Sequence, residues 1–516
     1  MSATDRSKLD VPGFGGRQLK VGLWLLFLLV VIRLGWMADD AYISLRTVWN
    51  FTHGYGLTWN PVERVQAFTH PLWLFVLAAA HTLSGEMYLT VLLVSIFSTA
   101  LAVALVLARL ATRLPQAVAF VVLLLCSQAV LDYTTSGLEN PLSLLLAAIF
   151  CWLWFAPADQ PKPLFRLFLV GCLLTLNRLD LVLLVLPALA WLLWRQRSWR
   201  SLLMASLALL PLLAWEVFSL IYYGVPFPNT YYAKLSTGIP AAEYRLQGLL
   251  YLVDLATHDP GTLLLVLLGI GSAFGSDTAR RPLACGLLLY LAYVISAGGD
   301  FMQGRFLSVP AFIAAILLTV DRRDATGLPF GSQAMLGSVA LVVVLAATRL
   351  INIEGPDPLI RTSGVANERQ YYAASTALSN YSRDRLVPYN HPWGELGRSM
   401  SQRPPERIFE AGVIGFMGYA AGPTVQLVDH HALSDAFLAR LPCLRPWRIG
   451  HFKRAFPDGY LASLRSGENR IVDPALRPLY DDVRLVTRGE LFSAERWAAI
   501  GRLNRYRVAD VAPPPP

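Results

Sequence analysis

The sequence contains few charged residues. Only 15% of its 516 residues are Asp, Glu, Lys or Arg, whereas 55% are hydrophobic and the mean hydropathy is +0.46. This composition is typical of a polytopic membrane protein and argues against a soluble one. The net charge of +9 does not indicate a nucleic-acid partner, because in such a chain Lys and Arg mark cytoplasmic loops and interfacial anchors.

Cysteine is also scarce, and its positions suit no disulfide framework. Four of the five cysteines lie in apolar segments, and Cys443 has no partner in the polar C-terminal region. No CxxC motif is present, so the cysteines predict neither a disulfide scaffold nor a metal site. A repeat of fixed period is missing as well, which argues against a transporter built from inverted repeats.

Long apolar runs, in contrast, are abundant and predict about eleven membrane crossings. Basic loop residues such as Arg109, Arg195 and Arg280 all fall on the cytoplasmic side if the N-terminus is cytoplasmic. This arrangement requires that the shorter apolar stretch 71–83 lies in the interface or re-enters. The predicted crossings are residues 21–37, 89–108, 116–131, 141–156, 165–176, 181–195, 201–222, 262–275, 283–297, 306–320 and 333–349.

After residue 350 the composition changes, and no apolar run of membrane length remains. An odd number of crossings places this part outside the cytoplasm. Residues 407–429 contain short apolar runs separated by Gly and Pro, as expected for strands that alternate with tight turns or a short helix. The predicted fold is therefore an α-helical polytopic membrane protein with a C-terminal soluble α/β periplasmic domain. Its predicted parts are a cytoplasmic tail (1–20), a transmembrane domain (21–349) with a first extracytoplasmic loop (38–88), a cap (350–512) and a disordered tail (513–516).

Five polar loops gather on the predicted extracytoplasmic face. Each has a charged residue beside aromatics, Gly or Pro. Any one of them alone would be explained as a helix cap or a turn, but five on one face predict a binding or catalytic site. The loops begin with DDAYISLR at residue 39 and include residues 132–140, 177–180, 222–234 and 298–305.

Transfer of a sugar from a lipid phosphate to a hydroxyl group suits these residues. The reaction needs one carboxylate near the anomeric carbon and the acceptor hydroxyl, plus cations that hold the departing phosphate. Adjacent residues on a helix point about 100° apart, so one of Asp39 and Asp40 faces the acceptor while the other caps, binds sugar or holds a metal. We predict that Asp39 is the essential carboxylate, because it comes first after the apolar segment. Candidate phosphate ligands are Arg46, Arg64, Arg178, Lys234 and Arg305.

Several motifs together resemble a known family. DDAYISLR, GYGLTWNPVERVQAFTHPLW (54–73), SGLEN (136–140), NRLD (177–180), PNTYYAK (228–234) and GGDFMQGRF (298–306) look like the extracytoplasmic loops of the bacterial arabinofuranosyltransferases of the C-type glycosyltransferase fold. GVIGFMGYAAGPTVQLVDHHALSD (412–435) and RIGHFKRAFPDGYL (448–461) resemble that family's periplasmic cap. The sequence departs from the family pattern at His70, Leu179 and residues 430–432, which concern the acceptor pocket more than the carboxylate.

The resemblance implies a glycosyltransferase that takes arabinofuranose from a polyprenyl-phosphate donor and passes it to an extracytoplasmic glycan or protein hydroxyl. It implies a multi-pass protein of the bacterial inner membrane, with the active site outside the cytoplasm. It places the catalytic carboxylate at Asp39 or Asp40 and donor contacts at Arg46, Arg178, Lys234 and Arg305. The residues expected to bind substrate are Glu63, Arg64, His70, Glu139, Asp180, Asn229, Tyr231 and Asp300.

Alternatives stay open at this point. Another sugar, such as mannose or aminoarabinose, would use the same fold, and a flippase or transporter for a lipid-linked sugar belongs to a different class. The transporter is disfavoured because the charges lie mainly at helix ends. No cofactor is certain, although a divalent cation is an open alternative. Adjacent His430 and His431 on a strand would point to opposite faces, which argues against a joint metal site with Asp429.

Overall fold

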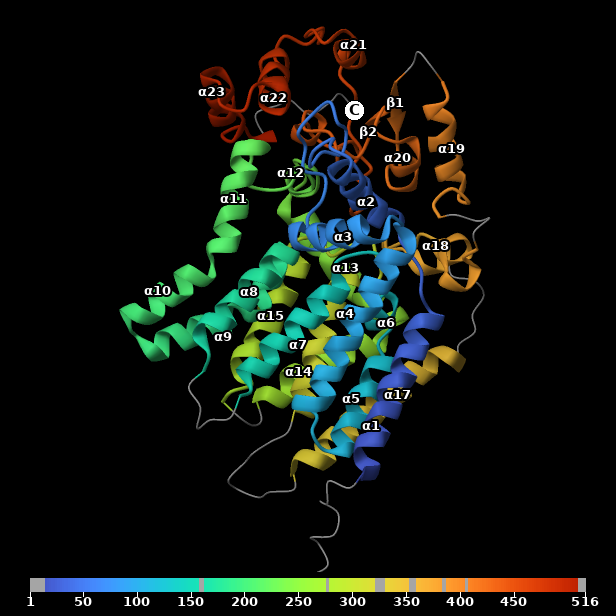
Figure 1. Cartoon of the computed structure of the whole chain (residues 1–516), viewed down its shortest axis with the longest axis vertical. Helices are drawn as coiled ribbons and strands as arrows, with labels where there is room; N and C mark the ends of the chain where they lie inside the picture. Colours follow the sequence, from blue (N-terminus) through green and yellow to red (C-terminus); the bar gives the residue numbers. More distant parts are fainter. Residues whose placement is uncertain are drawn as a thin grey trace, which may run out of the picture.

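The computed structural model describes residues 14–156, 162–274, 278–320, 330–351, 359–382, 387–403 and 407–508. Most of the predicted cytoplasmic tail (1–20) and the predicted disordered tail (513–516) lie outside these residues, although helix α1 already begins at Phe14. In Figure 1 the helices form an elongated body, and the C-terminal part sits on the end away from the start of α1.

Each apolar run predicted to cross the membrane contains a helix, because such runs have no backbone alternative in lipid. Two of the runs are each divided between two helices. The helices are α1 (Phe14–Arg33), α4 (Tyr88–Arg109), α5 (Leu114–Leu125), α6 (Gln128–Asp132), α7 (Asn140–Trp154), α8 (Leu164–Asn177), α9 (Val182–Gln196), α10 (Trp199–Ala208), α11 (Leu210–Tyr222), α14 (Pro260–Phe274), α15 (Arg281–Ser296), α16 (Ser308–Thr319) and α17 (Phe330–Ile351).

The outer surface of these helices supports a membrane-embedded protein. Leucines on their outer faces are strongly exposed, as on Leu93 (64%) and Leu213 (58%), which is unfavourable in water and suits lipid. Within the described residues, two helices are long and apolar enough to span a membrane, or four if two bent pairs each count as one span. One of these pairs is α10 with α11, bent by 49°. Its helix α10 projects from the side of the body in Figure 1.

The stretch 71–83 forms α3 (Pro71–Ser84), which begins with Pro at its first position and ends at Gly85, whose φ is +70°. Its 14 residues reach roughly 21 Å, less than the roughly 30 Å of a hydrocarbon core. Figure 1 shows α3 lying across the ends of the upright helices. A non-crossing α3 is consistent with this placement.

Sequence analysis missed one long helix, α13 (Ala241–His258). It carries charged Glu243, Arg245 and Asp254 among its leucines, so no apolar run marks it. It meets α14 at an angle of 109° and packs against α15. At this contact Gly248 lies so close to the backbone of Ile295 that a Cβ atom would not fit.

The cap is less of an α/β domain than predicted. Its described residues contain two strands of four residues each, β1 (Ile408–Ala411) and β2 (Gln426–Asp429), which pair in parallel on either side of α20 (Phe416–Ala421). The rest is helices and loops: α18 (Glu368–Thr376), α19 (Pro392–Ser401), α21 (Tyr460–Ser466), α22 (Arg477–Arg488) and α23 (Ala494–Leu503).

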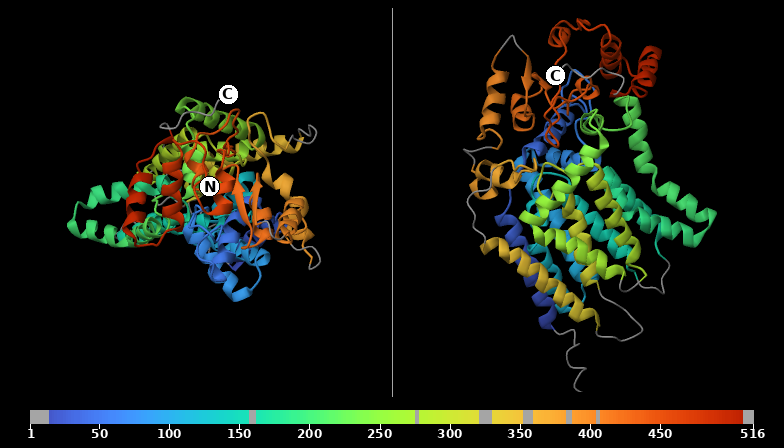
Figure 2. Two further views of the ribbon diagram at one scale, coloured as in Figure 1. Left: turned by 90° about the horizontal axis from the view of Figure 1, so that it is seen from above. Right: turned by 180° about the vertical axis from the view of Figure 1, so that it is seen from behind.

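Within its described residues, the cap shares its hydrophobic core with the first loop and the transmembrane part. One hydrophobic cluster joins Trp73 and Tyr88, from the first loop and α4, to Phe416, Phe437 and Tyr480 of the cap. Helix α2 (Asp39–Thr52) lies between two groups of cap elements, one made of α21, α22 and α23 and the other of β1, β2, α19 and α20 (Figures 1 and 2). The cap is therefore built around the predicted catalytic loop, which fixes the position of that loop.

Candidate active site

One face of helix α2 packs against the cap, and the neighbouring face carries Asp40. Asp39, Tyr42 and Arg46 are spaced by three and four residues and therefore share one face. The carboxylate of Asp39 accepts hydrogen bonds from the backbone N–H groups of Gly415 (3.2 Å) and Phe416 (2.7 Å) at the start of α20. Asp39 thus fastens the cap to the end of α2.

Asp40 points from the neighbouring face into open space. It lines two cavities, of about 420 Å³ and about 280 Å³, which also share Lys234. Burial raises the pKa of Asp40, while the nearby charges of Lys234 and Arg305 lower it. Burial also raises the pKa of Asp39, to about 7, against the effect of its hydrogen bonds to the cap. Asp39 lines only the second cavity and is held by the cap, so the geometry favours Asp40 as the carboxylate that meets a ligand, contrary to the prediction from the sequence.

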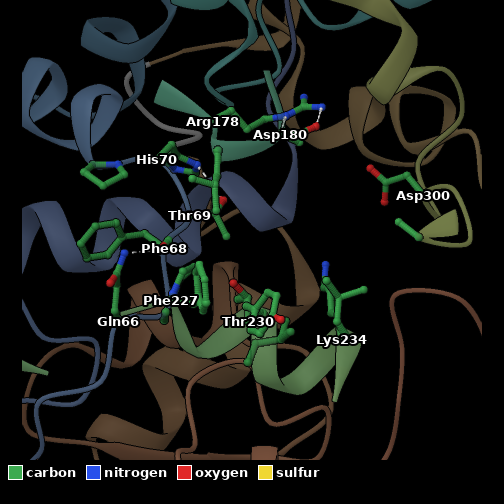
Figure 3. A pocket seen from close by; sticks show the side chains of 18 of the residues that line it. Gln66, Phe68, Thr69, His70, Arg178, Asp180, Phe227, Thr230, Lys234 and Asp300 are labelled. Atoms are coloured by element: carbon green, nitrogen blue, oxygen red, sulfur yellow. Dashed lines mark hydrogen bonds and ion pairs between the residues drawn. The ribbon is translucent and has the colours of Figure 1, made fainter. Parts of the chain in front are cut away.

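The first cavity, of about 420 Å³, extends from Asp40 toward the membrane helices. Its wall there is apolar, with Leu183 of α9, Leu212 of α11 and Phe227. Its polar end holds Arg178, Asp180 and Asp300, and Figure 3 shows Lys234 pointing from α12 (Asn229–Leu235) into the space between them. Of the predicted residues, this cavity brings together Asp40, His70, Arg178, Asp180, Tyr231, Lys234, Asp300 and Arg305.

Glu139 lies behind this polar end, fully buried, and is not among the residues that line the cavity. Its carboxylate contacts Arg305 at 3.2 Å, His70 at 3.3 Å and Arg178 at 3.5 Å. Burial alone would raise the pKa of Glu139, but Arg305 and Arg178 outweigh this and lower it to about 2. The structure therefore does not place Glu139 in the cavity wall, where it was predicted to bind substrate; its carboxylate orients the cationic side chains instead.

Arg178 and Arg305 are largely neutralised before any ligand enters. Arg178 donates to both oxygens of Asp180, at 2.8 and 2.7 Å, and Arg305 lies 3.7 Å from Asp300 in addition to its contact with Glu139. Lys234 differs from both: among the described residues its ammonium makes no hydrogen bond or ion pair, and it lies 5.5 Å from the ring of Phe301. Lys234 is therefore the cation most available to an incoming phosphate.

Four further predictions are corrected because the side chains serve the cap interface. Arg46 is buried, stacks on Trp59 and donates to the carbonyls of Trp59, Gly418 and Val425. It lies on the Asp39 face of α2 and lines neither cavity. The structure therefore does not place Arg46 at the donor cavity, as the sequence predicted.

The other three also lie outside both cavities. Arg64 donates to the carbonyls of Val486 and Gly489, and Glu63 lies 3.5 Å from Arg488. The amide of Asn229 donates to three backbone carbonyls between residues 432 and 435. These side chains tie the transmembrane part to the cap, and the structure does not place them in the wall of either cavity.

The second cavity, of about 280 Å³, lies between Asp40 and the cap. Sequence analysis missed several of its lining residues, which are separated by hundreds of positions from α2 and form no local motif. It did place residues 412–435 and 448–461 in the cap by resemblance, and both segments contribute to the wall. The polar and aromatic lining residues include Glu368, Tyr371, Tyr372, Trp393, Asp429, His431, Arg448 and His451.

The adjacent histidines lie in a turn after β2, not on a strand as predicted, and their side chains have different surroundings. His431 faces the second cavity and packs edge-on against His451, while His430 stacks on Phe456 near Glu410. Across the described ranges, no group of three or more His, Cys, Asp or Glu side chains is arranged to hold a metal ion. A divalent cation therefore stays a prediction.

No family model matches this chain. It is similar to two curated relatives named terminal beta-(1->2)-arabinofuranosyltransferase. The relative from Mycobacterium tuberculosis is 27% identical over 86% of both chains. The relative from Corynebacterium glutamicum is 28% identical over 65% of this chain and 55% of its own length. The resemblance predicted from the loop motifs is confirmed, and with it a glycosyltransferase enzyme.

Two solved structures are also similar. Undecaprenyl phosphate-bound ArnT from Cupriavidus metallidurans aligns with a TM-score of 0.46 and 13% identity, over 80% of this chain and 86% of ArnT. The archaeal oligosaccharyltransferase AglB from Archaeoglobus fulgidus, in complex with an inhibitory peptide and a dolichol-phosphate, aligns with a TM-score of 0.43 and 12% identity, over 80% and 65%.

Proposed function

We propose that the protein transfers arabinofuranose from a polyprenyl-phosphate donor to a hydroxyl group of an extracytoplasmic acceptor. The observation that carries this proposal is the meeting of two cavities at Asp40 and Lys234. One cavity has an apolar wall on membrane helices, and the other opens among polar and aromatic cap residues. The names of the two curated relatives support arabinofuranose as the sugar.

The donor would occupy the first cavity, with its isoprenoid chain along Leu183, Leu212 and Phe227. Its phosphate would meet Lys234, with Arg178 and Arg305 behind it. Three cationic side chains face four carboxylates there: Asp40, Glu139, Asp180 and Asp300. Positive charge is therefore not in excess, and Lys234 is the group that would hold the phosphate and stabilise its added negative charge as it leaves.

The acceptor would enter through the second cavity, so that its hydroxyl group lies beside Asp40. Asp40 would take the proton of this hydroxyl while the oxygen attacks the anomeric carbon and the bond to the phosphate oxygen breaks. A carboxylate whose pKa is raised by burial is a stronger base than one in water, which favours this step.

The direct test is an assay of the purified protein in lipid nanodiscs with a panel of polyprenyl-phosphate sugars: arabinofuranose, mannose and aminoarabinose. Consumption of the arabinofuranose donor and release of polyprenyl phosphate are expected. Preferential use of another sugar would replace the donor in this proposal, and movement of an intact lipid-linked sugar across the bilayer without cleavage would indicate a flippase.

Lys234→Ala should raise the donor KM about 10-fold or more, since a hydrogen bond to a charged group contributes about 1.5–3 kcal/mol. The matched control is Lys453→Ala, because Lys453 is an exposed lysine of the cap. Steady-state rates over a range of donor concentrations provide the measurement. An unchanged donor KM in Lys234→Ala would contradict the proposal that Lys234 binds the donor phosphate.

We further propose eleven crossings and an extracytoplasmic cap, from the distribution of basic loop residues. A reporter that is active only in the periplasm, fused near residue 440, should give signal, and a reporter active only in the cytoplasm should stay silent at the same point. The opposite pattern would mean an even number of crossings, most simply with α3 crossing the membrane.

A further inference from the structure

Two carboxylates in the second cavity are already engaged by the protein. Asp39 accepts from the backbone of Gly415 and Phe416, and Asp429 accepts from the N–H groups of His431 (2.8 Å) and Leu433 (2.6 Å). These side chains hold the cap loops and have little capacity left for a ligand. The other two acidic side chains in the wall are Asp40 and Glu368.

Glu368 is different because nothing in the described structure occupies its carboxylate. It accepts no hydrogen bond and forms no ion pair within the described ranges. It occupies the first turn of α18, whose start is capped by Asn367 through a 3.1 Å bond to the N–H of Gln370. Glu368 is thus a fixed acceptor of hydrogen bonds that faces the cavity.

Little positive charge balances this carboxylate. His431 and His451 are neutral at pH 7, because burial lowers their pKa values to about 4 and about 3. Lys234 is shared with the first cavity, where the donor phosphate needs it. Arg448 also lines the cavity; its charge lowers the pKa of Glu368, and its Nε donates to the carbonyl of Gly364 at 2.8 Å.

Carboxylates outnumber cationic side chains in the wall of this cavity by four to two, which makes the local field negative. Burial raises the pKa of Glu368 well above its usual value, and the charges of Asp40 and Asp39 add to this effect. A phosphate or carboxylate of an incoming molecule would meet the same field, whereas hydroxyl groups would donate hydrogen bonds to Glu368. Aromatic Tyr371, Tyr372 and Trp393 in the same wall suit the apolar face of a sugar ring.

We propose that Glu368 is a specificity-determining residue that binds hydroxyl groups of an uncharged, polyhydroxylated acceptor and disfavours acceptors with an anionic group beside the reacting hydroxyl. This inference rests on the proposed function, since it assigns the second cavity to the acceptor. Glu368 lies 328 positions after Asp40 in the sequence, and no motif of the first loops indicates it.

The test uses two probes: an octyl pentofuranosyl disaccharide, and the same molecule with a phosphate ester on a neighbouring hydroxyl. Binding to the full-length protein in nanodiscs is measured by calorimetry without donor, and transfer is measured separately. Wild-type protein should bind the neutral probe about 10-fold more tightly than the phosphorylated one. Glu368→Gln should weaken binding of the neutral probe about 10-fold and narrow the difference between the two probes.

The matched control is Glu410→Gln, because Glu410 lies on β1 outside both cavities and its side chain is 48% exposed. This control should bind both probes as the wild type does. Unchanged binding of the neutral probe in Glu368→Gln, or tighter wild-type binding of the phosphorylated probe, would overturn the inference. A wild-type protein that binds the neutral probe but never cleaves the donor would contradict the proposed function and leave the assignment of Glu368 intact.

Discussion

Asp40→Asn should lower the rate of sugar transfer about 100-fold or more while the protein stays folded, because loss of a general base removes a factor of this order. Asn has nearly the same shape, and among the described residues the carboxylate of Asp40 accepts no hydrogen bond that the fold would lose. The expected defect is therefore in kcat, at unchanged thermal stability. In the wild type, activity should fall as the pH drops and Asp40 becomes protonated.

Asp39→Asn is the matched comparison on the neighbouring position. An amide has one acceptor oxygen where the carboxylate has two, so at least one of the N–H groups of Gly415 and Phe416 would lose its partner. An unsatisfied buried group costs about 1–3 kcal/mol, so this variant should melt earlier and keep measurable transfer. Near-normal transfer in Asp40→Asn together with an inactive but stable Asp39→Asn would return the catalytic role to Asp39.

The two aspartates show which features of the site the sequence predicts and which it does not. The position of the pair after an apolar segment and the helical angle between them were both predictable. Which of them reaches both cavities and which is held by the cap depends on where residues 415 and 416 pack, and no local pattern contains that information. The position of Arg46 could have been predicted from the sequence, because it lies two turns after Asp39 and hence on the Asp39 face of α2.

Some helices could likewise be predicted from the sequence and others could not. The apolar runs predicted α4 and α7 because one physical requirement, burial in lipid, determines both their length and their composition. The mixed composition of α13 gave no such signal. The second cavity was the least predictable feature, since Glu368, His431 and Arg448 come together only when the cap folds onto the end of α2.

Glu139→Gln should produce the largest loss of stability among the site variants. Glu139 is fully buried and holds Arg305, Arg178 and His70 at once. Removing one partner of a buried ion pair costs about 3–5 kcal/mol, and the lower end is expected here because Arg178 keeps Asp180. The measurement is the thermal unfolding of the variant in nanodiscs beside the wild type.

The matched control for this change is Glu468→Gln, which removes an exposed ion pair with Arg470 on the surface of the cap. Such pairs contribute about 0–1 kcal/mol, so this variant should unfold close to the wild-type temperature and keep its activity. Equal stability of the two variants would show that Glu139 is not the counter-charge of the buried arginines. A fall in stability confined to Glu139→Gln would instead mean that the phosphate-binding end of the first cavity is held in place by a charge that substrate never touches.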